Sequence, residues 1–223
     1  MPKIAAGVVR FQKEVYPEKR ELFARLAKGQ QPDALFITCS DSRIDPNLVT
    51  QTEPGELFIC RNAGNIVPPH TNHTGGMTAS IEYAVAVLGV QDIVVCGHTG
   101  CGAIDGAMHP EEIADLPHVS QWLGYSRAAV QIVLENGKHL DPEAKLQMLL
   151  EQNVLLQLQH LRTHPHVAAG LAGGRLQLHG WIYDILHGGM TAYDDEAGGF
   201  VDVETHYAED VARYADSIEG GRS

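Results

Sequence analysis

The chain has 223 residues, of which 44% are hydrophobic and 20% are charged. These proportions are close to the averages for globular proteins, so they exclude a disordered or low-complexity chain and predict one domain over 1–223 with a full core. The formal charge is −12, from 16 basic and 28 acidic residues. Because this charge opposes phosphate backbones and anionic lipid surfaces, we expect neither nucleic acid nor a membrane among the partners.

The first part of the chain predicts a helical arm over 1–30, followed by strands. Apolar residues recur with the period of an amphipathic helix over 4–15, until Pro17 interrupts the pattern. A second helix, with Leu22, Phe23 and Leu26 on its apolar face, ends near Gly29. Residues 76–88 are small and apolar over helical length, which predicts a crossover helix. Apolar runs typical of strands buried on both faces of a sheet occupy 34–38, 57–60 and 93–96.

The second part predicts two further helices and a pair of strands. The helices cover 119–136 and 144–162, and the second ends before Pro165. A strand that reaches 181–185, a turn with two glycines and a strand over 190–193 follow, and a flexible tail is expected over 217–223. The fold class is therefore α/β, with a mostly parallel central sheet flanked by helices, an N-terminal helical arm and a C-terminal strand pair.

No segment is expected to cross a membrane or to direct secretion. The longest strongly apolar stretch, 83–90, is far shorter than the roughly 20 residues that span a bilayer. Residues 1–10 lack an apolar run followed by a small-residue cleavage site. We therefore expect a reducing cytoplasmic location, where the four cysteines serve metal binding or catalysis more readily than a disulfide framework.

Two clusters of chemically active residues directly follow predicted strands. The first is CSDSR at 39–43 and the second is HTGCG at 98–102. Strand ends are where open α/β sheets build their sites. A catalytic zinc ion keeps three protein ligands and one open position, and Cys39, His98 and Cys101 would meet that count. His98 and Cys101 share a turn that contains glycine, so both can face one ion while Cys39 arrives from the neighbouring strand.

The alternative for these cysteines is a place in the core, because free cysteine often behaves as a small buried hydrophobe. Cys60 and Cys96 fit that alternative best, since each ends an apolar run. A histidine three residues before Cys101, with a glycine on either side of that cysteine, is an unusual composition for plain core. We therefore favour the metal role for Cys39, His98 and Cys101.

The two clusters match the CxDxR and HxxC motifs of a known family, and the chain resembles the β-class carbonic anhydrases, above all the bacterial and cyanobacterial members related to the plant enzymes. The resemblance covers most of the chain. Beyond the two motifs it rests on ordered segments at 29–30, 58, 61–65, 81–84, 96–98 and 178–181.

The resemblance implies a zinc enzyme, with one Zn²⁺ per chain held by Cys39, His98 and Cys101. The fourth zinc ligand would be a water whose pKa falls from 15.7 to about 7, so that it becomes the nucleophile. The implied activity is that of a carbonic anhydrase, a lyase that hydrates carbon dioxide reversibly to bicarbonate and a proton by attack of zinc-bound hydroxide on CO₂.

Asp41 and Arg43 stand two residues apart, so in an extended segment their side chains share a face and can pair. An ordinary surface ion pair is the alternative. The resemblance instead implies a catalytic pair, in which Asp41 accepts a hydrogen bond from the nucleophile and Arg43 holds Asp41 charged and oriented. Members in which this aspartate closes onto zinc carry Trp at the position of Phe36, so we expect the permanently open form here.

The resemblance also implies a substrate pocket that is shared between subunits. A small apolar molecule needs a small apolar slot with one or two polar groups for the charged product. In the family the helical arm wraps a partner subunit, so we expect a homodimer or a higher even oligomer in which some pocket residues serve a neighbour's zinc. The implied CO₂ and bicarbonate contacts are Gln30, Phe58, Ala63, Tyr83 and the backbone N–H of Gly102.

Three alternatives to this activity remain at the level of sequence. The same zinc site could act on CS₂ or COS, because no insertion blocks access. A catalytically silent zinc scaffold is a second alternative, although the intact Asp41, Arg43 and Gln30 argue against it. A thiol redox role is the third, and the lack of a Cys-x-x-Cys pair weighs against it.

Overall fold

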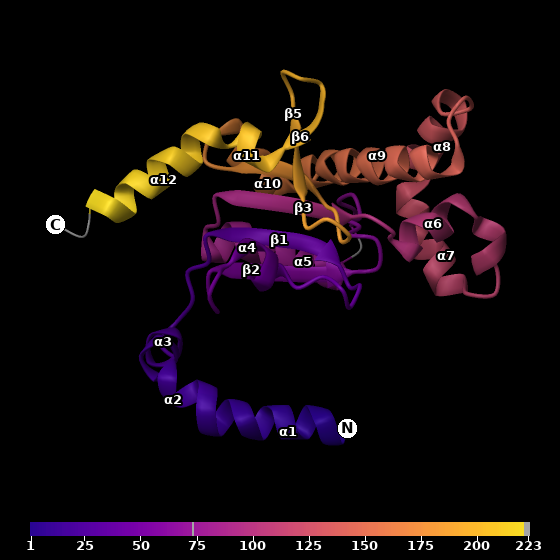
Figure 1. Ribbon diagram of the computed structural model, residues 1–223. Coiled ribbons are helices and arrows are strands. Elements are labelled where there is room, and N and C mark those ends of the chain that lie inside the picture. The colour runs from indigo at the N-terminus through magenta and orange to yellow at the C-terminus, as the bar shows by residue number, and fades with distance from the viewer. Residues whose placement is uncertain (73, 221–223) are drawn as a thin grey trace.

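The structure, a computed structural model, describes residues 1–72 and 74–220. Within these residues six strands form one sheet in the order β2-β1-β3-β4-β5-β6 (Figure 1). Strands β2, β1, β3 and β4 run parallel, and β5 and β6 continue the sheet in antiparallel pairing. The strands are β1 Ala34–Cys39, β2 Leu57–Asn62, β3 Asp92–His98, β4 Gln177–Tyr183, β5 Met190–Asp194 and β6 Gly199–Asp202.

The helices of the first half form the arm and the first crossover. In Figure 1 the arm, α1 to α3, lies apart from the sheet. The helices are α1 Pro2–Arg10, a π-helical turn η1 Phe11–Val15, α2 Tyr16–Glu18, α3 Arg20–Leu26, α4 Pro46–Thr50, α5 Gly76–Tyr83 and a π-helical turn η2 Ala84–Leu88.

The helices of the second half cover the sheet and lead to the C-terminal end. The longest of those described there is α9, which packs against β3 and β4. These helices are α6 Gly102–Met108, the 3₁₀ turn η3 Pro110–Ile113, α7 Pro117–Leu123, the 3₁₀ turn η4 Gly124–Ser126, α8 Arg127–Asn136, α9 Pro142–Arg162, α10 Pro165–Ala172, α11 Val203–His206 and α12 Ala208–Gly220.

The alternation of side chains along the central strands creates two apolar layers. Leu35 and Ile37 of β1 point to the face that α9 and the other helices cover, and both are fully buried. Phe36 points to the opposite face, where it packs with Val94 and meets the ring of Trp181. Complete burial of β1 and β3 explains why both strands are continuous apolar runs. Strand β2 lies at the sheet edge and is buried less completely, with Phe58 and Cys60 in one apolar layer and Leu57 and Ile59 in the other.

Helix α9 approaches the sheet at two strand glycines. A Cβ atom on Gly180 of β4 would lie 2.9 Å from Val154 Cγ1 and 3.1 Å from Leu158 Cδ1, and one on Gly97 of β3 would lie 3.0 Å from Val154 Cγ2. The absence of a side chain at these positions lets the helix sit directly on the strands. The helix begins at a capping residue, Asp141, whose side chain accepts a hydrogen bond from the N–H of Ala144.

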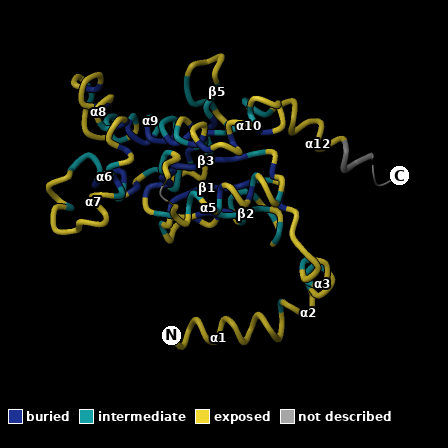
Figure 2. The backbone as a smooth tube through the Cα atoms, turned by 180° about the vertical axis from the view of Figure 1, so that it is seen from behind, coloured by how far each residue is buried: buried dark blue, intermediate teal, exposed yellow. Residues whose placement is uncertain are grey.

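The arm is a chain of short helices with its apolar side chains in the open. None of α1 to α3 contains a buried residue, and Ile4 and Val8 are 65% and 52% exposed (Figure 2). Pro17 does not interrupt the helical backbone as expected, since α1, the π-helical turn η1 and α2 follow one another without a break. The wider π-helical turn lies directly before this proline, whose ring and missing N–H disturb the preceding turn of a helix.

Three features of the second half differ from the sequence-based expectation. The helix expected over 119–136 is two helices, because the chain tightens at Gly124–Ser126 and the hydroxyl of Ser126 turns inward to Asn153. The C-terminal strand pair is extended by β6, which the sequence pattern did not indicate. Helix α12 continues to Gly220 and thus overlaps the tail expected over 217–223, whose last residues, 221–223, lie outside the described residues, so the flexible tail stays a prediction.

No helix within 1–72 or 74–220 has the length and apolar character that a bilayer crossing requires.

The close contact of α9 with β4 gives a stability prediction. We expect Gly180→Ala to destabilise the fold by about 1–3 kcal/mol, because the added methyl group overlaps Val154 and Leu158. Gly199→Ala in β6 is the matched control, since a Cβ there meets nothing within 4 Å. Urea denaturation of both variants measures the effect, and equal stability of the two would contradict the packing argument.

Candidate active site

Three side chains meet in the interior where β1 and β3 end. Cys39 is the last residue of β1, His98 is the last residue of β3, and Cys101 caps the start of α6. All three are at least 96% buried, and their ligand atoms lie within 4.8 Å of one another. Since β1 and β3 are parallel neighbours, their carboxyl ends bring the two sequence clusters together. The sequence-predicted ligand set is thus assembled by adjacent strands.

The geometry of this set fits a tetrahedral zinc ion. The sulfurs of Cys39 and Cys101 are 3.8 Å apart. Two sulfurs that each lie about 2.3 Å from a tetrahedral ion stand about 3.8 Å from each other. His98 Nδ1 lies 3.0 Å from the carbonyl oxygen of Thr99 and donates to it, so Nε2 carries the free lone pair. Nε2 is buried and has no hydrogen-bond partner in the protein, which is the condition of a ligand atom reserved for a metal.

The two thiols titrate as a pair in the absence of a cation. Hydrogen bonding from the Cys101 thiol lowers the pKa of Cys39, and His98 and the N–H of Gly64 act in the same direction. The bond to Cys39, together with burial, raises the pKa of Cys101. The pair therefore favours one thiolate and one thiol, and a divalent cation would favour two thiolates. Cys96, by contrast, has its pKa raised to about 12 by burial on the other face of the sheet, as expected for a cysteine of the core.

Asp41 and Arg43 form a rigid pair beside the ligands. Arg43 Nε and the Arg43 backbone N–H donate to Asp41 Oδ1 at 2.9 and 3.0 Å, and Arg43 Nη2 donates to Oδ2 at 2.7 Å. The same Nη2 donates to the carbonyl of Gly100 at 2.9 Å, inside the turn that joins the two later ligands. These hydrogen bonds hold the pKa of Asp41 well below its usual range. Asp41 Oδ2 lies 3.9 Å from His98 Nε2, so an ionised carboxylate borders the ligand set.

Two further residues, Arg61 and Gly64, contact the segment around Cys39, and sequence reasoning did not assign these contacts. Arg61 Nε donates to the carbonyl of Cys39 at 2.9 Å, and Arg61 Nη2 donates to the carbonyl of Asp41 at 2.7 Å. The N–H of Gly64 points at the Cys39 sulfur from 3.4 Å. Both residues lie in the RNAGN stretch at 61–65, which starts in the last two residues of β2 and continues into the loop after it. This stretch is one of the segments on which the family resemblance rests, but only the pairing of β1 with β2 shows what these residues contact.

The turn between β4 and β5 braces the loop after His98. The backbone N–H of Thr99 donates to the carbonyl of Tyr183 at 2.9 Å, and the Thr99 hydroxyl accepts from the N–H of Ile185 at 3.0 Å. Asp184 lies within 3.4 Å of the same hydroxyl and is itself held by His187, whose hydrogen bond lowers its pKa. Because the carbonyl of Thr99 accepts from His98, this brace also fixes the orientation of the imidazole.

The structure separates the predicted substrate residues into two groups. Ala63 directly precedes Gly64, whose N–H points at Cys39 Sγ, and the Ala63 carbonyl accepts from Trp122 Nε1 at 2.9 Å. Gly102 directly follows Cys101 and opens α6, where helical N–H groups lack helical partners. Phe58 and Tyr83 pack together with ring centroids 6.1 Å apart. Gln30 is exposed in the segment between α3 and β1.

The second group does not reach the ligands of its own chain. Phe58 pairs with Leu35 in the strand register, whereas Asn62 pairs with Cys39. Four residues of strand separate these positions, which is about 13 Å along the sheet. Tyr83 is 45% exposed beside Phe58, so this ring pair faces outward at the β2 edge. Within the described residues of one chain, Phe58 and Tyr83 are therefore remote from Cys39.

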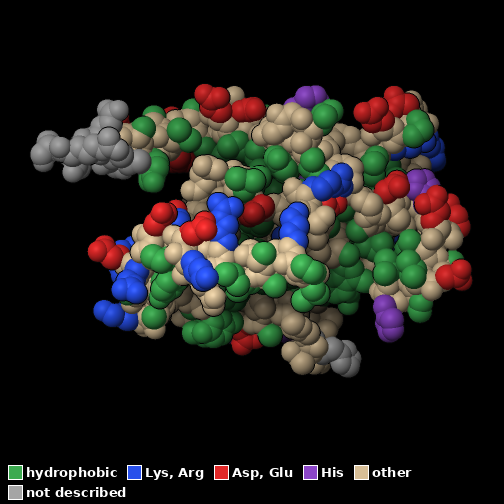
Figure 3. Space-filling model, turned by 60° about the horizontal axis from the view of Figure 1, so that its bottom comes forward, with side chains coloured by type: hydrophobic (Ala, Val, Ile, Leu, Met, Phe, Trp, Pro, Cys, Tyr) green, Lys and Arg blue, Asp and Glu red, His purple; other side chains and the backbone are tan. Residues whose placement is uncertain are grey.

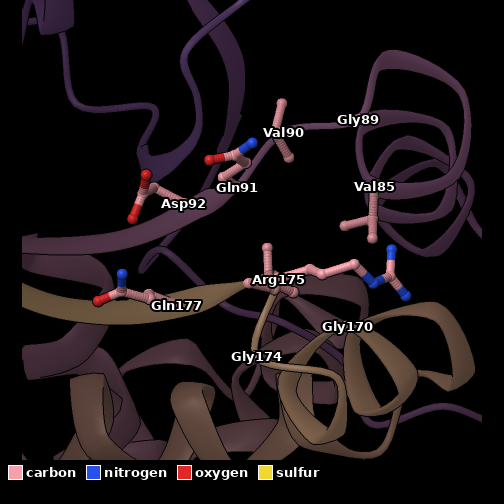
Figure 4. A pocket seen from close by; sticks show the side chains of 10 residues that line it. Val85, Gly89, Val90, Gln91, Asp92, Gly170, Gly174, Arg175 and Gln177 are labelled. Carbon is pink, nitrogen blue, oxygen red and sulfur yellow. The ribbon is translucent and has the colours of Figure 1, made fainter.

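A cavity of about 380 Å³ lies at the other end of the strands (Figure 4). It is lined by Asp92 and Gln177, which begin β3 and β4, and by Arg175 and glycines near α10. Ligands of open α/β sheets bind at the carboxyl ends of the strands, and this cavity is at the amino ends. The Cys39, His98 and Cys101 set is consequently the better candidate for the active site.

Comparisons with known proteins agree with this site. The family model for carbonic anhydrase matches residues 34–190. A carbonic anhydrase of Pseudomonas aeruginosa is 50% identical over 206 residues, which cover 92% of this chain and 93% of that protein. The structure of the β-carbonic anhydrase CcaA superposes with a TM-score of 0.88 at 43% identity, covering 91% of this chain and 98% of that one. A tetrameric β-carbonic anhydrase of Sordaria macrospora gives a TM-score of 0.74 at 29% identity over 85% and 94% of the two chains.

The family match spans the whole parallel part of the sheet and both ligand clusters. The chain therefore belongs to the β-class carbonic anhydrases and is a carbonic anhydrase by family and fold.

Proposed function

We propose that the chain hydrates carbon dioxide reversibly with one Zn²⁺ per chain, bound by Cys39, His98 and Cys101. The observation that carries this proposal is the buried set itself, with its sulfurs 3.8 Å apart and an unpartnered imidazole nitrogen between two strand ends. When bound, zinc supplies a water acidic enough to lose its proton near neutral pH. Three protein ligands leave one tetrahedral position open for that water.

Asp41 orients the attacking water in this proposal. Its pKa, lowered by the hydrogen bonds from Arg43, keeps it ionised at neutral pH, so it can only accept a hydrogen bond. Accepting that bond directs a lone pair of the water toward the carbon of CO₂. Arg43 holds both carboxylate oxygens, and its bond to the Gly100 carbonyl fixes the pair relative to the ligands. This arrangement favours the open form that we expect from Phe36.

We further propose that the substrate slot is completed by a second copy of the chain. The N–H of Gly102 and the backbone at Ala63 come from the loops of the same chain. Phe58 lies about 13 Å along the sheet from Cys39 and Tyr83 packs against it, so in this proposal the two rings, together with Gln30, serve the site of a neighbouring copy. Figure 3 shows exposed hydrophobic side chains among basic ones on the face where the arm comes forward, as expected of a segment that covers another subunit.

A homodimer is therefore the smallest assembly that we propose, with higher even oligomers built from it. The relative from Sordaria macrospora is described as tetrameric, which supports the proposal of an even-numbered oligomer. Ile4 and Val8 of α1 are largely exposed and belong to neither hydrophobic core cluster of the described residues. The partners are CO₂ and bicarbonate, and the cytoplasmic location expected from the sequence stays a prediction.

The alternatives receive less support than CO₂ hydration. A silent zinc scaffold has no use for the three hydrogen bonds that orient Asp41, or for their anchor on Gly100. A redox role needs no histidine, whereas the imidazole of His98, whose ligand nitrogen lies within 4.8 Å of both sulfurs, supports metal binding by this group. Action on CS₂ or COS would use the same ligands, and nothing in the site favours it.

Removal of one ligand tests the proposed activity. We expect Cys101→Ser to lower the zinc content from near one per chain to near zero and to reduce CO₂ hydration to the uncatalysed rate, because two ligands do not retain the ion. Cys96→Ala is the control, since Cys96 is buried on the other face of the sheet, and it should keep both zinc and activity. Stopped-flow hydration with metal analysis measures both. Full activity in zinc-free Cys101→Ser would exclude the proposed site.

The Asp41 and Arg43 pair gives a second prediction. Arg43→Lys keeps the positive charge but loses the planar fork, so we expect kcat/KM to fall by about 10–100-fold with unchanged zinc content. The exposed Arg162→Lys is the control.

The unchanged protein should be active at both pH 7 and pH 8.5, because Arg43 keeps Asp41 ionised and hydrogen-bonded. Activity of the unchanged protein at pH 8.5 alone would show instead that Asp41 closes onto the metal.

The shared slot gives a third prediction. Light scattering at micromolar concentration should give at least twice the chain mass. Tyr83→Ala should lower kcat/KM without loss of zinc, since Tyr83 is remote from the Cys39, His98 and Cys101 set of its own chain. Val87→Ala, exposed one turn further along the same helical segment, is the control. A monomer that retains full activity would contradict the shared slot.

A further inference from the structure

Helix α9 carries a buried polar stripe that the proposed mechanism does not use. Asn153, Gln157 and His160 follow one another at helical spacings of four and three, so they share a face of α9. Asn153 is 1% exposed and Gln157 is fully buried, among apolar neighbours such as Val154 and Leu158. Burying amides in such surroundings is costly unless every group finds a partner. The partners of these side chains show what the stripe holds.

Three hydrogen bonds of the stripe go to the loop that follows β2. Asn153 Nδ2 donates to the carbonyl of Gly64 at 3.2 Å. Gln157 Oε1 accepts from the N–H of Val67 at 2.8 Å, and His160 Nδ1 donates to the carbonyl of Val67 at 2.7 Å. The loop therefore has no freedom to shift along α9.

The stripe is also connected within itself. Gln157 Nε2 donates to Asn153 Oδ1 at 2.9 Å, and the Ser126 hydroxyl donates to the same oxygen at 2.8 Å. Both oxygen lone pairs are thus occupied, and the amide of Asn153 is fixed with its Nδ2 toward Gly64. The orientation of that one amide depends on two further buried groups.

The held loop touches the ligand set at one atom. The N–H of Gly64 lies 3.4 Å from Cys39 Sγ, and the carbonyl of the same residue is the group that Asn153 holds. Gly64 has a φ of +81°, and a Cβ on it would lie 3.1 Å from Ile104 Cδ1, so the close approach requires glycine. An N–H aimed at a cysteine sulfur orients the ligand and offsets its negative charge, as groups behind metal ligands generally do.

We propose that Asn153 and Gln157 are positioning residues of the metal centre, which hold the Gly64 N–H against the sulfur of Cys39. The inference rests on the proposed function, because it assumes that Cys39 binds zinc. It assigns to the stripe a role beyond docking α9 on the loop. Loss of the stripe should weaken metal binding more than the accompanying loss of stability explains.

The test measures zinc affinity by competition with a chromophoric chelator on the full chain. We expect Asn153→Leu to raise the Kd for Zn²⁺ about 10–100-fold. Gln157→Met should change the Kd in the same direction, and it carries the test if Asn153→Leu does not fold. Leu149→Ala is the matched control, because Leu149 is fully buried on α9 and donates no hydrogen bond to the loop. Thermal unfolding of the metal-free variants gives the stability loss against which the Kd values are compared.

A spectroscopic readout separates positioning from stability. In the Co²⁺-substituted protein, the sulfur-to-cobalt charge-transfer band should move to lower energy in Asn153→Leu, because a sulfur without its N–H donor holds its electrons less tightly. The band should stay in place in Leu149→Ala. If Asn153→Leu and Leu149→Ala lose the same stability, raise the Kd for Zn²⁺ equally and leave the charge-transfer band unmoved, the inference is overturned.

The failure of the proposed function has a different signature. If Cys101→Ser binds Zn²⁺ as tightly as the unchanged chain, the ligand set itself is wrong, and the inference falls with it. If only Cys101→Ser loses zinc and Asn153→Leu does not, the proposed function stands and the inference alone is overturned.

Discussion

The candidate active site depends on keeping the sulfurs of Cys39 and Cys101 3.8 Å apart inside the protein. Two buried thiolates at that distance repel each other, and no water compensates their charge. Without a cation the pair favours a single thiolate, which is why the pKa of Cys39 is lowered and that of Cys101 is raised. A divalent cation changes this balance, since it compensates both charges at once. The charge that a bound metal would compensate is therefore set by the two sulfurs that β1 and the start of α6 place side by side.

Around the sulfurs the chain relies on bonds to backbone carbonyls more than on contacts between side chains. Arg61 holds the carbonyls of Cys39 and Asp41, Arg43 holds that of Gly100, and His98 holds that of Thr99. The loops that follow β1 and β3 are thereby fixed to one another. Arginine suits this task because its planar fork offers several donors at fixed angles. Because these bonds fix the loops through the backbone, Nε2 of His98 is held in place without a hydrogen-bond partner of its own.

The sequence was informative wherever a pattern is local. The apolar runs of β1 and β3 are continuous because both strands are buried on both faces, and the CxDxR and HxxC clusters contain the three residues that the structure brings together. Local pattern failed where long-range contacts decide. The helix break at Gly124–Ser126 follows the inward turn of Ser126 toward Asn153, and β6 forms only by pairing with β5. The contacts of Arg61 and Gly64 with Cys39 require the register of β1 against β2, which no local spacing contains.

The position of Phe58 and Tyr83 is the reason why we propose that one chain does not complete the site by itself. The pairing register sets Phe58 about 13 Å back from the ligand end of β1, so no side-chain rotation brings it to its own Cys39. The arm leaves apolar residues exposed on the same chain, and burying them against a second copy stabilises both. In the arrangement that we propose, the assembly that covers the arm also closes the slot. Folding, association and substrate binding would then be linked, since each buries surface that the others leave open.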